Sequence, residues 1–169
     1  MNLFVEFKNQ RQTFDVIDRQ ETGAAYKADG CHRATGKLAV VMVTSGPRSD
    51  PRTYKCVMNA QADGSAMQAI TGEVDEKYFG KGPLEEKVDC GLDVKAVFGT
   101  AVQYSTQITS ESQFQTLLQQ ALRDALSIPR RAAHLGIPVN VTAQSIAAVS
   151  IPFATECDRR LRAGFRRTK

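Results

Sequence analysis

Tryptophan is absent from this chain of 169 residues, and histidine and cysteine are scarce, with two and four residues. The cysteines, at positions 31, 56, 90 and 157, form no Cys-x-x-Cys pair, and the two histidines do not stand at the spacing of a structural zinc site. A chain of this length buries enough surface to need no disulfide framework, so we expect four free thiols.

Long apolar runs are also missing. No segment approaches the roughly 18 consecutive apolar residues that a membrane-spanning helix needs. The first residues, Met-Asn-Leu-Phe-Val-Glu, have neither the basic start nor the apolar core of a signal peptide. We therefore expect a cytoplasmic protein without a membrane partner, with its thiols in a reducing compartment.

Basic charge is concentrated at the C-terminus. Residues 157–169 hold six basic side chains and one acidic, whereas the whole chain has a net charge of +4, so the rest is close to neutral. A basic tail can bind nucleic acid, but no aromatic-studded basic surface accompanies this one, so we do not expect such binding. We divide the chain into one domain at 1–145 and a basic tail or linker at 146–169.

Hydrophobic patterning predicts alternating strands and helices. Short apolar runs predict strands at 14–17, 38–43, 66–70, within 96–104 and at 132–137. Helical patterns predict helices at 21–35, from Asp50 as cap to about 62, and at 114–126, where Ser110 and Gln113 suggest a capping box. Between them, 75–93 is expected to hold short helix and loop.

This alternation is typical of an α/β fold with a doubly wound, mostly parallel sheet and helices on both faces. Ligands bind such folds beyond the carboxyl ends of the strands, and the loops at 19–21 and 44–47 qualify best. The segment 30–37 is not a phosphate loop, because five residues separate its glycines and Leu38 stands where a Ser or Thr is required.

Glu21 lies where the first short strand meets the first helix, at the expected carboxyl edge of the sheet. Position alone leaves two interpretations open. The carboxylate either complements the dipole of the first helical turn or has a functional role.

The order of several segments bears on that choice. They are 19–37 (RQETGAAYKADGCHRATGK), 40–47 (VVMVTSGP), 69–74 (AITGEV) and 135–141 (LGIPVNV). Together, over about residues 14–141, they resemble the pyrimidine-binding (PYR) domain of thiamine-diphosphate-dependent enzymes of the acetolactate synthase and 2-oxo-acid decarboxylase type.

The resemblance implies roles for two parts of the chain. Glu21 would be the activating glutamate, which exchanges a proton with the aminopyrimidine ring of thiamine diphosphate. That role needs a carboxyl group that is shielded from water and able to hold a proton near neutral pH. Thr44, Ser45, Gly46 and Pro47 would form the turn beside the pyrimidine. The cofactor itself would supply the carbon chemistry.

Three features depart from the family pattern. Only 13 residues precede Phe14, so the family's first βα unit is expected to be mostly missing. Arg48 stands where another glycine usually follows Gly46-Pro47, and Cys31-His32 replaces the usual aromatic residue and alanine.

The resemblance also implies a partner. The family holds the diphosphate and Mg²⁺ through a second (PP) domain with a Gly-Asp-Gly motif and a later Asn. The near matches in this chain, Ala-Asp-Gly at 28–30 and 62–64, lack the first glycine and the distant Asn pattern. We therefore expect the isolated chain to contact only the pyrimidine end, with weak or absent cofactor binding, and to hold Mg²⁺ only through a PP-domain partner.

Two functions follow from these observations. The first is the pyrimidine-binding half of an enzyme that acts on a small 2-oxo acid and needs a separate PP domain. The alternative is a non-catalytic, truncated PYR-fold protein that self-associates without cofactor. Both predict a homodimer. The substrate, a flavin requirement and the oligomer size are left open.

Overall fold

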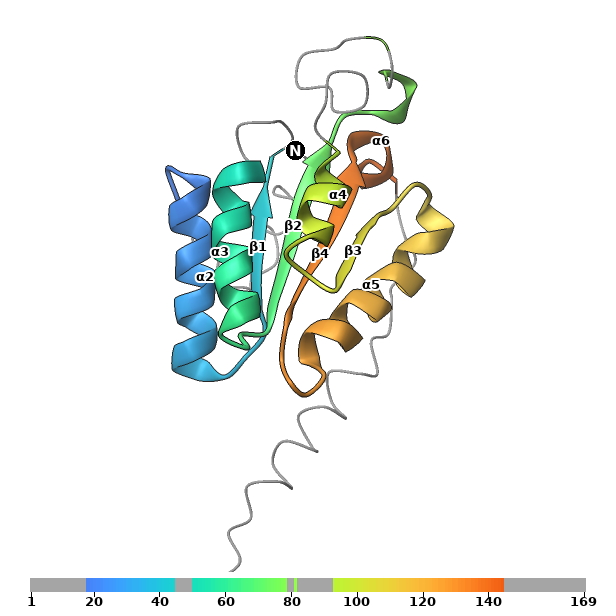
Figure 1. The fold of residues 1–169 in the computed structure, drawn as a ribbon. Helices are drawn as coiled ribbons and strands as arrows, with labels where there is room; N and C mark the ends of the chain where they lie inside the picture. Colours follow the sequence, from blue (N-terminus) through green and yellow to red (C-terminus); the bar gives the residue numbers. More distant parts are fainter. Residues whose placement is uncertain (1–17, 45–49, 79–80, 82–92, 145–169) are drawn as a thin grey trace, which may run out of the picture.

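A four-stranded parallel sheet forms the centre of the fold (Figure 1). The computed structural model describes residues 18–44, 50–78, 81 and 93–144. The strands, in the spatial order β1-β2-β4-β3, are β1 (Ala39–Val43), β2 (Met67–Glu73), β4 (Ala132–Pro138) and β3 (Tyr104–Gln107). Every neighbouring pair is parallel, which confirms the predicted α/β fold.

Helices cover both faces of this sheet. The helices are α2 (Glu21–Thr35), α3 (Asp50–Ala62), α4 (Val94–Gly99), α5 (Glu111–Leu126) and α6 (Val139–Thr142), with a 3-10 turn, η1, at Glu76–Tyr78. Residues of α2, α3 and α4 share one core with β1 and β2, and residues of α5 and α6 share a second core with β4. None of the described helices is long and apolar enough to cross a membrane.

Small residues allow α2 to pack closely against α3, beside which it runs in Figure 1. Ala25 is fully buried in the same core as Cys56 and Ala60 of α3, and Ala24 and Ala28 pack against that core. The helix ends at Gly36, whose φ of +70° lies in the left-handed region that glycine adopts without strain, and whose N–H bonds the His32 carbonyl. The predicted helix at 21–35 is therefore confirmed.

Helix α5 covers the other face. Ala121 and Ala125 are fully buried and pack with Leu135 and Ile137 of β4, as the apolar period of this helix predicted. The predicted capping box is wrong. The Ser110 hydroxyl lies 2.9 Å from that of Ser112, and the Thr109 hydroxyl donates to the Gln113 side chain instead, at 3.0 Å.

Two predicted strands need correction. Most of the segment at 96–104 is not a strand: its first half belongs to α4, whose Val94 and Phe98 lie four residues apart and are buried together. Asp93 caps this helix by accepting from the Ala96 N–H at 3.0 Å, and the strand begins only at Tyr104. Strand β2 extends to Glu73 because its polar last residues still pair with β4. The predicted strand at 14–17 lies outside the described residues.

Two described cysteines are free thiols, as expected: Cys31 is exposed and Cys56 is buried between α3 and α2. Burial raises the pKa of the Cys56 thiol by removing its charged form from water. Cys90 and Cys157 lie outside the described residues.

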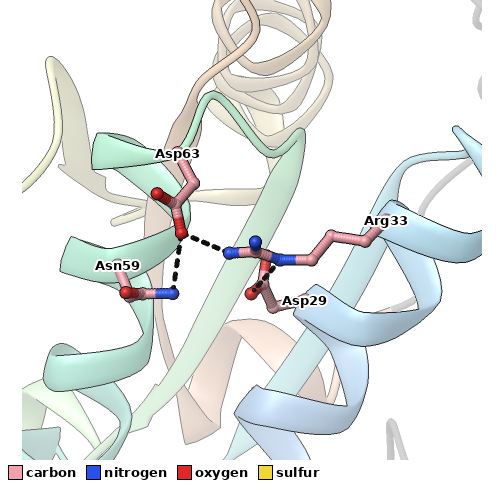
Figure 2. A network of polar contacts seen from close by, with 4 residues as sticks. All are labelled: Asp29, Arg33, Asn59 and Asp63. Atoms are coloured by element: carbon pink, nitrogen blue, oxygen red, sulfur yellow. Dashed lines mark hydrogen bonds and ion pairs between the residues drawn. The ribbon is translucent and has the colours of Figure 1, made fainter.

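A polar network joins the C-terminal ends of α2 and α3 (Figure 2). Arg33 donates from Nε to the Asp29 carboxylate at 2.8 Å and pairs through its other end with Asp63. Asn59 also donates to Asp63, at 3.1 Å. Asp29 is only 4% exposed, so Arg33 supplies the positive charge that a buried carboxylate requires.

We expect Arg33→Met to lower the free energy of unfolding clearly more than a control substitution does, because it leaves the buried Asp29 carboxylate without its partner. Urea unfolding followed by circular dichroism measures this. Lys55→Met, at an exposed site of α3, is the matched control and should change the value by less than about 0.5 kcal/mol. Equal, small effects of the two substitutions would show that the network adds nothing to stability.

Candidate functional site

The carboxyl ends of the parallel strands meet at one edge of the sheet. Val43 at the end of β1 aligns with Thr71, and Glu73 at the end of β2 aligns with Pro138 at the end of β4. Helices α2 and α3 both begin at this edge, since each runs antiparallel to the strand that follows it (Figure 1). Helix N-termini and strand ends together form the place where ligands bind in α/β folds.

Glu21 is the first residue of α2 and therefore lies at this edge. Its side chain is 28% exposed, and its Oε2 lies 3.3 Å from a guanidinium nitrogen of Arg52 in α3. The Thr22 hydroxyl donates to the backbone carbonyl of Arg52 at 3.5 Å. These contacts hold the first turn of α2 against the start of α3.

The helix N-terminus and Arg52 both stabilise the negative charge of Glu21. The N-terminal end of α2 carries a partial positive charge, and Arg52 adds a full one. The carboxylate is thus partly open to solvent and paired with a cation, whereas a role in proton exchange calls for a shielded carboxyl group. The helix-dipole role and the catalytic role are compatible with this position, and the catalytic role stays a prediction.

Asp18 makes contacts at the start of the same helix. Its carboxylate lies 2.7 Å from Lys27 Nζ, and the hydrogen bond with Lys27 is the main reason why the pKa of Asp18 is lowered. A Cβ at Gly23 would lie 2.7 Å from the Asp18 carboxylate, so the missing side chain of Gly23 makes room for it.

The predicted turn at 44–47 is described only at Thr44, which directly follows β1 and is exposed. Thr44 therefore lies at the same edge as Glu21. Ser45, Gly46 and Pro47 lie outside the described residues. Among the residues described, no three His, Cys, Asp or Glu side chains are placed to hold a metal ion.

A buried polar chain that runs from the middle of the sheet to this edge was not predicted. The imidazole of His134, fully buried in β4, lies 3.0 Å from the Thr71 hydroxyl and 2.8 Å from the Ser105 hydroxyl. Thr71 in turn lies 3.2 Å from Oε1 of Glu73, which is 5% exposed. The sequence feature that could have indicated it is the histidine within the apolar segment at 132–137. Hydrophobic patterning interprets such a histidine only as a core residue.

Packing fixes the middle of this chain, at His134, and one end, at Glu73. The Phe98 ring of α4 stacks on His134 with centroids 4.1 Å apart and planes 7° apart. A Cβ at Gly136 would lie 2.9 Å from Oε1 of Glu73, so this glycine provides the space for the carboxyl group.

Comparisons with known proteins agree with the sequence resemblance. Residues 1–97 match the family described as "Thiamine pyrophosphate enzyme, N-terminal TPP binding domain". A putative acetolactate synthase large subunit, IlvB2, of Mycobacterium tuberculosis is 34% identical over 79% of this chain and 24% of its own length. A probable acetolactate synthase large subunit of Methanococcus aeolicus is 29% identical over 82% of this chain and 22% of its own.

The same similarity extends to a eukaryotic relative. The mitochondrial acetolactate synthase catalytic subunit of Saccharomyces cerevisiae is 29% identical over 76% of this chain and 18% of its own length. The chain thus spans less than a quarter of each of these curated relatives. Because the family match covers more than half of the chain, the chain belongs to the thiamine pyrophosphate (thiamine diphosphate) enzymes, through their N-terminal TPP binding domain.

Proposed function

We propose that this chain supplies the pyrimidine-binding half of a thiamine-diphosphate-dependent site that acts on a small 2-oxo acid, as in acetolactate synthases. The observation that carries the proposal is the position of Glu21, in the first turn of α2 at the carboxyl edge, in a chain that belongs to this family. The names of the relatives support acetolactate-synthase-like chemistry.

The described residues fit one end of the cofactor. The Glu21 carboxylate is exposed enough for a ring nitrogen to reach it, and the neighbouring Thr44 lies at the same edge. When bound, the cofactor supplies the electron sink for carbon–carbon chemistry. The part of this chain is to place Glu21 against the pyrimidine and to exchange a proton at its carboxylate oxygen.

Arg52 competes for that carboxylate. Ligand binding at Glu21 must therefore displace the guanidinium or share the carboxylate with it. An exposed ion pair contributes about 1 kcal/mol or less, so its displacement is a small obstacle. We assign the diphosphate and Mg²⁺ to a PP domain on another chain, because the resemblance implies a Gly-Asp-Gly motif for them and this sequence lacks one.

The isolated chain is expected to bind thiamine diphosphate with millimolar affinity or weaker. A few hydrogen bonds to the pyrimidine contribute about 1 kcal/mol each, against an association cost of at least about 4 kcal/mol. Isothermal titration calorimetry with and without Mg²⁺ measures this. Micromolar binding by the chain alone would contradict the division of the site between two chains.

With a PP-domain subunit present, we expect decarboxylation of a 2-oxo acid to appear and Glu21→Gln to abolish it, because an amide keeps the shape of the side chain but cannot relay a proton. Arg52→Met is the matched comparison: it removes the cation but keeps the carboxylate, so activity should persist. A Glu21→Gln complex as active as the unsubstituted one would rule out the proton-relay role.

A non-catalytic, self-associating protein is the second candidate, and an exposed apolar surface supports the self-association that both candidates predict. Val40 in the middle of β1 is 51% exposed, and the adjacent Leu38 and Met42 are only partly buried, on the sheet face opposite α2 and α3. This apolar surface is suited to a second copy of the chain.

Both candidates predict a homodimer, and multi-angle light scattering across a concentration series tests it. We expect a mass of two chains, and Val40→Lys should shift the population to one chain by placing a charge in the apolar contact. Lys55→Glu, on the opposite side of the sheet, is the control. A single-chain mass at all concentrations would contradict self-association.

A further inference from the structure

Strand β1 is the last strand on one side of the sheet, and its outer edge has no partner strand among the described residues. The Ala39 N–H donates to the Ala66 carbonyl, beside β2, at 3.1 Å. Successive residues of a strand point their backbone groups to opposite sides, so Val41 also faces β2. The N–H and C=O groups of Val40 and Met42 therefore point away from β2 and form an open hydrogen-bonding edge.

The side chains along β1 do not protect this edge. Residues 38–43 are Leu-Ala-Val-Val-Met-Val, without a charge or a proline. Natural proteins usually protect an exposed edge with charged residues, with proline or with a covering element, because an open edge pairs readily with another strand. The edge of β1 is therefore suited to a further strand.

The path of the chain favours a strand that precedes α2. Helix α3 connects β1 to its parallel neighbour β2, and α2 packs on the same face of the sheet as α3. Connections between parallel strands have the same, right-handed sense almost without exception. Because α2 and α3 share a face, a strand before α2 must lie on the side of β1 away from β2, which is the open edge. Figure 1 shows α2 on that side, outside α3.

Residues 14–17, Phe-Asp-Val-Ile, have the composition and the position in the chain for this strand. They lie outside the described residues, and the described chain begins at Asp18, three residues before the start of α2. A strand of this length spans about 13 Å, enough to pair with most of β1. Connections as short as residues 18–20 are common between a strand and a helix in α/β folds.

We propose that residues 14–17 dock on the open edge of β1 as a fifth parallel strand of the sheet. This strand anchors the connection that leads into Glu21, and its pairing does not depend on thiamine diphosphate. Its contacts with β1 are backbone hydrogen bonds at the edge. They are separate from the apolar face of β1 that we assign to a second copy of the chain.

The side chains of this segment define its orientation. Asp15 is charged, and in a strand it points to the opposite face from Phe14 and Val16. On β1, the face towards α2 is buried, whereas the opposite face is half exposed at Val40. Phe14 and Val16 therefore face α2, and Asp15 lies on the open face with Val40.

This orientation also determines which residue bonds β1. In this sheet, residues that face α2 and α3 direct their N–H groups along the order β1-β2-β4. The N–H of Ala39 points to β2, and the N–H of Met67 points to β4, where it donates to the Arg131 carbonyl at 3.2 Å. The same chirality applies to a further parallel strand, so Val16 directs its N–H to β1 and Asp15 directs its N–H away from it.

Amide hydrogen exchange of the full chain, followed residue by residue with NMR, tests this pairing. In the unsubstituted chain we expect slow exchange at the Val40 and Met42 amides, because both donate to the added strand. Val16→Pro removes a backbone donor to β1 and should speed their exchange about tenfold or more. Asp15→Pro is the matched control: it removes an N–H that points to solvent, so exchange should change little.

The Val41 and Val43 amides face β2, and their protection in all three chains shows that each variant is folded. Unprotected Val40 and Met42 amides in the unsubstituted chain, or equal effects of the two proline substitutions, would overturn the proposal. Protection that rises with protein concentration would assign the edge to a second copy of the chain and would overturn it as well.

Discussion

Parallel pairing of β1, β2 and β4 is the constraint on which the remainder of this structure depends. Because these strands run in the same direction, their carboxyl ends and the N-termini of the helices on one face gather at one edge. Glu21, Thr44 and Glu73 come from separate parts of the sequence, and only this topology brings them to a common edge. An antiparallel arrangement would place some of them on opposite sides of the domain.

The two edges of the sheet have different chemistry. At the amino edge, Arg33 satisfies a buried aspartate, and its contacts serve to hold α2 on α3. At the carboxyl edge, the ion pair of Glu21 with Arg52 is partly exposed, so a ligand can compete for it at low cost. The described ion pairs at the amino edge thus hold the two helices together, whereas the one at the carboxyl edge is open to competition by a ligand.

Sequence patterns predicted the elements whose signals are local. The helix at 21–35 has a small-residue stripe and a terminating glycine, and the helix at 114–126 has a complete apolar period. Hydrophobic patterning failed where the local sequence suggests one element and packing against the sheet favours another. The short apolar run that begins at Ala96 predicted a strand, and only the burial of Val94 and Phe98, one helical turn apart, shows that it belongs to a short helix.

The candidate site, like the fold, could be predicted from the sequence only in part. The position of Glu21 at the carboxyl edge followed from the order of elements, whereas its contact with Arg52 depends on how closely α3 approaches α2, which no sequence pattern encodes. The buried chain at His134 was missed because its members lie on three strands, with Thr71 and His134 separated by 63 positions in the sequence. Whether Ser45, Gly46 and Pro47 contact a pyrimidine stays a prediction.

The most direct test of the proposed site uses thiamine, which carries the pyrimidine without the diphosphate. Backbone NMR shift mapping of the full chain at millimolar thiamine reports where the ring binds. The proposed site predicts shifts at the start of α2 around Glu21, at Thr44 after β1 and at the start of α3 around Arg52. Shifts confined to the opposite edge, around Asp29, Arg33 and Asp63, would contradict it.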